Sequence, residues 1–178
     1  MATSSHLVLL GAMGVGKTTV GRVVAAGLRR PLRDSDLELR AAGRNARDVA
    51  LVSGVDALHL LEADHLLGAL AAPEPAVIAA AASVVDDARC LAALEAPFAV
   101  WLWAPFETLA ERMRHGDHRR DLGDDPLVAM TALAQRRDPR YRQVADATID
   151  VGRLAADQVA EAVLSRFEAV DGGPRSPA

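Results

Sequence analysis

The sequence predicts an α/β protein built on a mainly parallel sheet. Two observations support this class: short apolar runs alternate with helical patterns along the chain, and neither a repeat nor an interdomain linker interrupts them. The 178 residues are enough for one domain with a sizeable core. We therefore expect a single domain over residues 1–170 and a disordered tail over residues 171–178, which is rich in glycine and proline.

Apolar runs of strand length and amphipathic runs of helix length give the expected order of elements. The expected strands are His6–Leu10, Pro31–Arg33, Ala76–Ala80, Phe98–Trp103 and Ala147–Val151. The expected helices are Lys17–Leu28, Asp36–Ala42, Ala46–Leu51, Val55–Leu70, Asp86–Ala93, Pro105–Arg114, Asp125–Val144 and Ala155–Ala169.

A phosphate-binding motif, G-x-x-x-x-G-K-T, lies between the first expected strand and the first expected helix. Glycines let the backbone turn so that successive N–H groups converge on phosphate oxygens, and the following helix adds the positive end of its dipole. Lys17 can reach the β- and γ-phosphates, and the Thr18 hydroxyl is placed to hold Mg²⁺. The candidate nucleotide-binding residues are Gly11, Ala12, Met13, Gly14, Val15, Gly16, Lys17, Thr18 and Thr19. The alternative, a glycine-rich turn with no ligand, is disfavoured by the strand before the motif and the helix after it.

Composition and charge exclude several classes of function. The net charge of −4 argues against general affinity for nucleic acid, and no apolar run approaches the length of a membrane span. The N-terminal residues show no signal-peptide pattern, so we expect a cytoplasmic protein. The single cysteine, Cys90, has neither a disulfide partner nor metal-ligating neighbours, and its spacing indicates a buried helix face.

The segment His115–Asp124 is the most polar stretch within the expected domain. It combines charges with two glycines and lacks apolar periodicity, which is typical of a surface loop. An ordinary solvated connection is one reading. In a phosphoryl-transfer enzyme, however, an arginine-rich loop can close over the nucleotide, exclude water and neutralise phosphate charge. We expect a mobile lid over about residues 115–124, with Arg119 and Arg120 as its candidate catalytic arginines.

Two aspartates in D-x-D spacing, Asp34 and Asp36, follow the second expected strand. At a strand end, alternate residues face the same side, so both carboxylates can point at the phosphate site. Asp34 then suits the surroundings of Mg²⁺, and Asp36 suits an acceptor hydroxyl. In the alternative reading Asp36 or Ser35 caps the next helix, which leaves Asp34 without a role.

These motifs together resemble the shikimate kinase family of P-loop small-molecule kinases. The resemblance rests on G-x-x-G-x-G-K-T-T-x-G-R at Gly11–Arg22, on the D-x-D pair, and on R-x-P-x-Y at Arg137–Tyr141. It extends from about Leu7 to Asp150 and implies the P-loop kinase fold: three layers, a five-stranded sheet flanked by helices, and a lid.

The resemblance also implies roles for individual residues. Lys17 and Thr18 would hold the phosphates and Mg²⁺ with help from Asp34, and Asp36 would bind the acceptor hydroxyls as a candidate base. Arg137 would hold a substrate carboxylate through a bidentate contact, unless it is a solvated arginine at a helix end. Either Arg119 or Arg120 would contact the phosphate, and Arg112 would flank the adenine.

Two departures from the family pattern fall on the acceptor side. His59 replaces the arginine of the family's F-R-x-x-E, and Ala80-Ala81-Ala82 stands where the family has three glycines. The added methyl groups obstruct close approach by a ligand, with Ala81 and Ala82 as expected pocket residues, and any position that needs positive φ becomes unfavourable. His59 could still pair with a carboxylate when protonated, or it could only pack on its helix.

The resulting hypothesis is an ATP-dependent phosphotransferase that transfers the γ-phosphate to a hydroxyl of shikimate or a similar small hydroxy acid or polyol, with Mg²⁺ as cofactor. We expect a monomer that binds neither nucleic acid nor membrane. One alternative is a kinase for gluconate, another sugar acid or an aminocyclitol. Another is an ATP-binding regulatory protein that has lost catalysis, although it would have no use for an acceptor-side carboxylate and arginine. A GTPase is disfavoured because no N-K-x-D sequence occurs.

Overall fold

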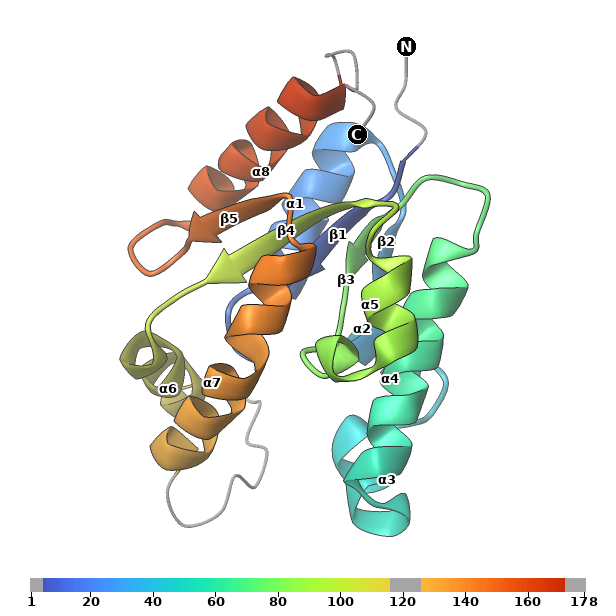
Figure 1. Cartoon of the computed structure of the whole chain (residues 1–178), viewed down its shortest axis with the longest axis vertical. Coiled ribbons are helices and arrows are strands. Elements are labelled where there is room, and N and C mark those ends of the chain that lie inside the picture. The colour runs from blue at the N-terminus through green and yellow to red at the C-terminus, as the bar shows by residue number, and fades with distance from the viewer. Residues whose placement is uncertain (1–4, 116–125, 172–178) are drawn as a thin grey trace.

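A computed structural model describes residues 5–115 and 126–171. Its sheet has five strands in the order β2-β3-β1-β4-β5, and every neighbouring pair is parallel (Figure 1). The strands are β1 (Leu7–Leu10), β2 (Leu32–Asp34), β3 (Val77–Ala79), β4 (Phe98–Trp103) and β5 (Ala147–Asp150). The predicted α/β class and five-stranded parallel sheet are confirmed.

Eight α-helices and one 3₁₀ turn occur in the described part of the chain. They are α1 (Lys17–Leu28), α2 (Ser35–Ala41), α3 (Ala46–Ser53), α4 (Val55–Leu70), η1 (Val84–Asp86), α5 (Ala88–Ala93), α6 (Phe106–His115), α7 (Pro126–Val144) and α8 (Ala156–Asp171). The expected helix Asp86–Ala93 is wrong in its first turn. Asp87 has an extended backbone and caps α5 by accepting from the Arg89 N–H, so the chain breaks between η1 and α5.

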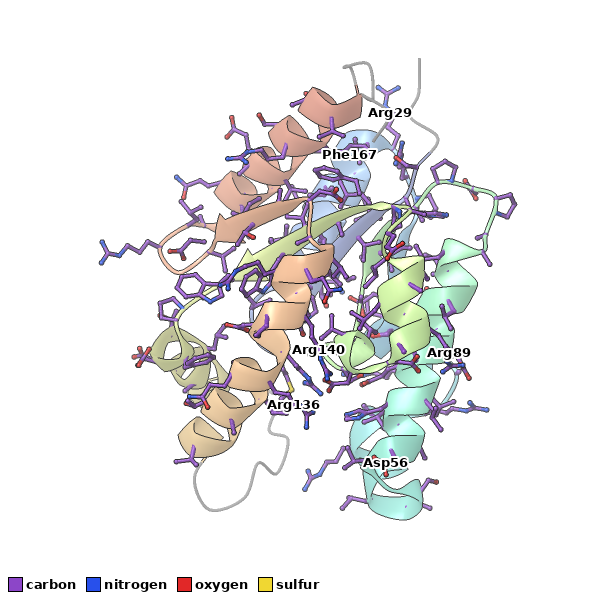
Figure 2. The ribbon with its side chains drawn as sticks, in the orientation of Figure 1. Arg29, Asp56, Arg89, Arg136, Arg140 and Phe167 are labelled. Atoms are coloured by element: carbon purple, nitrogen blue, oxygen red, sulfur yellow. The ribbon has the colours of Figure 1, made fainter. Side chains whose placement is uncertain are left out.

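Helices cover both faces of the sheet, which explains why the central strand, β1, is an unbroken run of apolar residues. Leu7 and Leu9 point into the core shared with α1 and α8, whereas Val8 and Leu10 point into the core shared with α4, α5 and α7. All four residues are fully buried, as expected for a parallel strand between two helical layers. Figure 2 shows Phe167 on the inner side of α8, where its ring packs on Phe98 with centroids 5.5 Å apart.

The topology determines where a ligand can bind. The chain leaves β1 for the edge strand β2, returns through β3 beside β1, and then crosses to β4 on the other side. Such a reversal of strand order next to β1 creates a crevice at the carboxyl ends of the strands, which is the usual ligand site of open α/β sheets. The loop after β1, Asp34 at the end of β2 and the alanines after β3 all lie at this edge.

The expected lid and tail fall largely outside the described residues. The lid segment 116–125, with Arg119 and Arg120, and the tail 172–178 are not described, and α6 extends to His115. The domain and lid bounds therefore stay predictions. Within the described ranges no helix is both long and apolar enough to cross a membrane.

Gly11 is the position where the fold depends most directly on the absence of a side chain. Its φ is +142°, and an added Cβ would lie 2.4 Å from the Leu102 carbonyl oxygen of β4. We expect Gly11→Ala to lower the free energy of unfolding by about 2–3 kcal/mol, because the loop or β4 must shift. Urea denaturation measures this.

Gly68→Ala is the matched control. Gly68 lies within α4, and an added Cβ would meet nothing within 4 Å, so this variant should gain about 0.5–1 kcal/mol from the lower backbone entropy of alanine. Equal stability of the two variants would show that the contact at Gly11 relaxes without cost.

Candidate active site

The loop between β1 and α1 has the backbone that phosphate binding requires. Gly11, Gly14 and Gly16 have φ values of +142°, +79° and +104°, a left-handed range that other residues rarely adopt. Gly16 is the N-cap of α1 and carries no side chain that could cap the helix. The first N–H groups of α1 therefore remain for an anionic ligand, which the helix dipole also favours.

Lys17 is the only lysine in the sequence, and its ammonium group lies against the loop. Its Nζ donates to the carbonyl oxygens of Gly11, at 2.8 Å, and Ala12, at 2.9 Å. Burial lowers the pKa of Lys17 to about 8, since desolvation disfavours the charged form. The carboxylates of Asp36, Asp34 and Glu62 oppose this shift in decreasing order.

The lowered pKa of Lys17 predicts that nucleotide binding takes up a proton in mildly alkaline solution. Free Lys17 is mostly neutral at pH 9, whereas phosphate oxygens beside it favour the ammonium form and raise its pKa. We expect uptake of about 0.9 proton per ATP at pH 9 and much less at pH 7. Calorimetric titrations in two buffers of different ionisation enthalpy measure this number. Lys17→Arg stays charged and should take up none; uptake equal to that of the native protein would assign the proton to another group.

Asp34 links the phosphate loop to α2. Its Oδ1 accepts from the Leu37 N–H at 3.0 Å, which makes it the N-cap of α2, and its Oδ2 accepts from the Thr18 hydroxyl at 2.7 Å. The alternative reading, with Asp36 or Ser35 as the cap, is wrong, because Asp34 has the extended backbone that precedes the helix. Asp34 is almost fully buried, so its carboxylate is held rigidly next to Thr18.

The pair of Thr18 and Asp34 fits a Mg²⁺ ion that arrives with a nucleotide. A hydroxyl and a carboxylate supply the oxygen ligands that Mg²⁺ prefers, and this ion usually takes few protein ligands beside phosphates and waters. Within residues 5–115 and 126–171 no group of three or more His, Cys, Asp or Glu side chains could hold a metal ion. The phosphates would therefore have to complete the coordination.

Asp36 lies in the first turn of α2, in agreement with the expected helix Asp36–Ala42, so the strand-end alternation that was expected to place it on the same side as Asp34 does not apply. The reason is that the helix begins at Ser35, directly after the cap. Asp36 nevertheless remains close to the phosphate loop, because its charge raises the pKa of Lys17 more than any other group does. It is solvent-exposed, so it can be reached by a small molecule.

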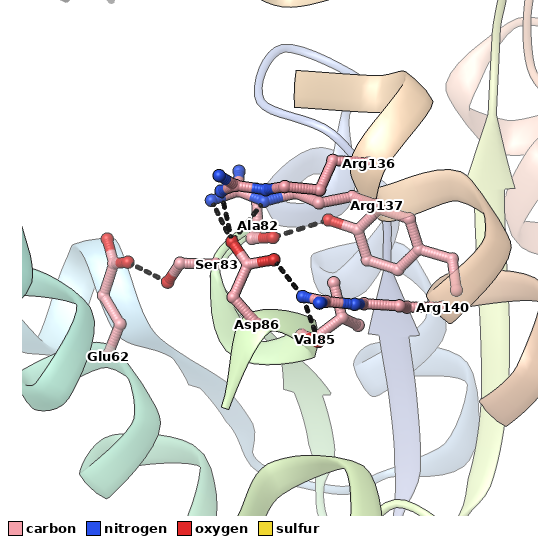
Figure 3. Close-up of polar contacts among 9 residues, drawn as sticks. Glu62, Ala82, Ser83, Val85, Asp86, Arg136, Arg137 and Arg140 are labelled. Atoms are coloured by element: carbon pink, nitrogen blue, oxygen red, sulfur yellow. Dashed lines mark hydrogen bonds and ion pairs between the residues drawn. The ribbon is translucent and has the colours of Figure 1, made fainter. Parts of the chain in front are cut away.

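Arg137 is a buried residue in the middle of α7, only 8% exposed, so its reading as a solvated arginine at a helix end is wrong. Its Nε and Nη2 lie 2.9 Å and 2.8 Å from Oδ2 of Asp86 in η1. Asp86 also pairs with Arg136 at 2.8 Å and with Arg140 at 2.6 Å (Figure 3). Figure 2 places Arg136 and Arg140 on α7.

Sequence reasoning missed Asp86, although a signal was present. Arg136 and Arg137 lie four and three residues before Arg140 on α7, so each has the spacing of a helical neighbour of Arg140. A cluster of like charges that is partly buried needs an anion, supplied either by the chain or by a ligand. The sequence could have raised this question, but it could not identify η1 as the source.

Tyr141 fixes α7 to the loop that follows β3. Its hydroxyl donates to the Ala82 carbonyl oxygen at 2.7 Å, and its ring stacks on Trp101 with centroids 5.8 Å apart. Burial raises the pKa of Tyr141 far above its ordinary value, so it stays a neutral donor. Because Tyr141 follows Arg137 by four residues, it holds the helix face that carries the arginine against the loop.

Ala80, Ala81 and Ala82 adopt backbone conformations that need no glycine. Among non-glycine residues in the described ranges, only Arg29 has a positive φ, so the strain expected at these alanines is absent. Ala80 is buried and donates its N–H to Leu9 O at 3.1 Å, which extends the β3–β1 pairing by one residue. Their expected contact with a substrate stays a prediction.

The remaining predicted residues fall into two groups. His59 is half-buried on α4, three residues before the buried Glu62, which accepts a short hydrogen bond from the Ser83 hydroxyl (Figure 3). Arg112 lies in α6, but its side chain, like Arg119 and Arg120, lies outside the described residues. The roles of these four predicted residues stay predictions.

Cys90 is buried in α5, as its spacing predicts. Burial raises the pKa of its thiol to about 11. A thiol that stays protonated at neutral pH is a poor nucleophile.

A glycine-rich loop suited to phosphate, a hydroxyl–carboxylate pair suited to Mg²⁺, and an exposed carboxylate and a buried arginine whose charges both act on Lys17 define a nucleotide-dependent enzyme of the P-loop small-molecule kinase class. The described helices and strands have the layers of that fold.

Comparison with known proteins identifies the family. The family model described as shikimate kinase matches residues 13–168. Shikimate kinases from Symbiobacterium thermophilum and Thermobifida fusca are 35% and 31% identical; the first alignment covers 92% of this chain and 96% of the relative, and the second covers 95% and 98%. The structure of shikimate kinase from Acinetobacter baumannii in complex with shikimate superposes with a TM-score of 0.87, at 29% identity over 94% of this chain and 95% of that chain. The chain belongs to the shikimate kinase family, and it is a small-molecule kinase.

Proposed function

We propose that the protein transfers the γ-phosphoryl group of ATP to a hydroxyl of shikimate or of a similar small hydroxy acid. One observation carries the proposal: both Asp36 and Arg137 lie near enough to Lys17 to act on its pKa, which the charge of Asp36 raises and that of Arg137 lowers. Groups suited to the phosphate donor, the acceptor hydroxyl and an acceptor carboxylate therefore converge on one site. The A. baumannii relative, whose structure holds shikimate, supports this acceptor.

Each residue has a distinct task in the proposed reaction. The backbone N–H groups of the loop and of α1 bind the phosphates, and Lys17 stabilises the charge that develops on the transferred group. Asp36 orients the acceptor hydroxyl and accepts its proton. Arg137 positions an acceptor carboxylate, while Thr18 and Asp34 would hold Mg²⁺, which neutralises phosphate charge when bound.

The finer parts of the proposal concern the setting of the enzyme. We propose a monomer. We also propose a cytoplasmic location, where ATP is available, and no partner other than small molecules.

An assay of ATP consumption against shikimate, gluconate, other sugar acids and an aminocyclitol tests the acceptor. We expect turnover with shikimate to exceed turnover with the other acceptors. Arg137→Ala should raise the KM for shikimate, whereas His59→Ala should leave turnover in place. ATP binding without turnover of any acceptor would contradict the proposal and favour a regulatory protein. Faster turnover of a sugar acid would transfer the proposal to that acceptor.

A further inference from the structure

We propose that Asp86 is a specificity-determining residue: its carboxylate competes with the carboxylate of an acceptor for Arg137. The inference rests on the proposed function in one respect, since it assumes that Arg137 faces the acceptor. It adds that the chain itself contains an anion at this arginine. Asp86 would therefore weaken the preference of the enzyme for carboxylated acceptors over neutral ones.

The geometry of the contact supports competition. The Nε–Nη2 edge of a guanidinium is one of the two edges that grip a carboxylate through paired hydrogen bonds. In Arg137 both atoms of this edge are directed at one oxygen of Asp86, at 2.9 Å and 2.8 Å (Figure 3). An acceptor carboxylate that approaches this edge must either displace Asp86 or lie beside it, and two carboxylates in contact repel each other.

Asp86 remains ionised throughout the neutral range. Burial alone would raise its pKa, but the hydrogen bond and charge of Arg137, together with those of Arg136, outweigh burial and hold the pKa below its ordinary value. The competing charge is therefore present at every pH at which the enzyme would work. Asp86 is therefore not protonated in this pH range, and a change of pH within it does not relieve the competition.

Asp86 has other cationic partners, so its negative charge stays paired when an acceptor takes its place at Arg137. Arg136 and Arg140 contact it at 2.8 Å and 2.6 Å, and their side chains are 55% and 40% exposed, whereas that of Arg137 is 9% exposed. Three guanidinium groups around one carboxylate leave the cluster positive. An anionic acceptor is still attracted, so Asp86 reduces the preference for carboxylated over neutral acceptors but does not abolish it.

Shikimate and its methyl ester provide a matched pair of probes, since they share their hydroxyls and differ in charge. We compare kcat/KM for the two acceptors in the native enzyme and in Asp86→Asn and Asp86→Ser. Loss of the Asp86 charge should raise the ratio of shikimate to ester by about tenfold or more, through a lower KM for shikimate. A merely structural role for Asp86 would change both acceptors alike and leave the ratio constant.

Asp87→Asn is the control variant. Asp87 is the next residue, carries the same charge and pairs with Arg89 at 2.7 Å rather than with α7. Asparagine is also an effective N-cap, so α5 should be preserved. This variant should keep the native ratio, which excludes a general effect of net charge.

The native enzyme gives a second measurement that does not require the variants to fold. It should prefer shikimate to the ester by less than about tenfold, a much smaller factor than an uncontested arginine–carboxylate pair would give. A native preference near a thousandfold, or a variant ratio that is unchanged or lower, would overturn the inference.

Direct titration separates the inference from the proposed function. Calorimetry of shikimate binding needs no turnover, and an equal Kd in the native protein and Asp86→Asn would overturn the inference alone. Absence of turnover with every acceptor, with tighter shikimate binding in Asp86→Asn, would overturn the proposed function and leave the inference standing. No binding of shikimate to any variant would overturn both.

Discussion

Lys17→Met is expected to lower kcat by about 10³-fold while the protein stays folded, because it removes a positive charge that stabilises the transferred phosphoryl group. Methionine retains the aliphatic stem, so packing against the loop is preserved. The Nζ hydrogen bonds to Gly11 and Ala12 are lost. At pH 7 the native protein must bury the charged Lys17, which costs stability, as the lowered pKa shows. Methionine does not carry this cost, so the thermal midpoint at pH 7 should not fall.

Steady-state kinetics and thermal unfolding together check this prediction. Lys17→Arg is the control that retains charge and should recover part of the activity. If Lys17→Met retained kcat within a few fold of the native value, Lys17 would have only a structural role, in which its hydrogen bonds to Gly11 and Ala12 hold the conformation of the loop.

Asp36→Asn is expected to lower kcat by about 10²–10⁴-fold, because the amide cannot accept the proton of the acceptor hydroxyl. KM for ATP should change little, since Asp36 lies on the acceptor side of the proposed reaction. The exposed position of Asp36 in the first turn of α2 makes a large loss of stability unexpected.

Asp48→Asn is the matched control for Asp36→Asn. Asp48 is also an exposed aspartate in the first turn of a helix, α3, so the same change of charge meets the same helix dipole. It should leave kcat unaltered. Equal rates for the two variants would remove Asp36 from the catalytic residues.

The sequence predicted those parts of the molecule that depend on local patterns. The loop Gly11–Thr18 has its three glycines, lysine and threonine within eight residues of the chain, so its geometry follows from local chemistry. The ranges of α1 and α4 were predicted to the residue, because each is a long helical pattern with distinct ends. In the run Asp34-Ser35-Asp36, however, each residue can cap a helix, and only the end of β2 decides among them.

The acceptor side was harder to predict because its contacts join distant segments. Asp86 and Arg137 are separated by 51 residues, and their pairing depends on how η1 and α7 pack on the sheet. The same packing brings Tyr141 to the carbonyl of Ala82. The residue pattern of η1 or of α7 taken alone does not predict these contacts. The sequence therefore indicated that Arg137 holds an anion but not that the chain provides one.

The solitary lysine of this chain also concentrates all side-chain amine reactivity at one place. Every other cationic side chain of the sequence is an arginine or a histidine, so an acylating reagent has Lys17 and the chain's α-amino group as its targets. Near pH 8 a large share of Lys17 is in the neutral, nucleophilic form. Acylation of this residue would then report directly on occupancy of the phosphate loop, because a bound nucleotide would shield it. Coupling the protein to a solid support through lysine would attach it at its proposed catalytic loop.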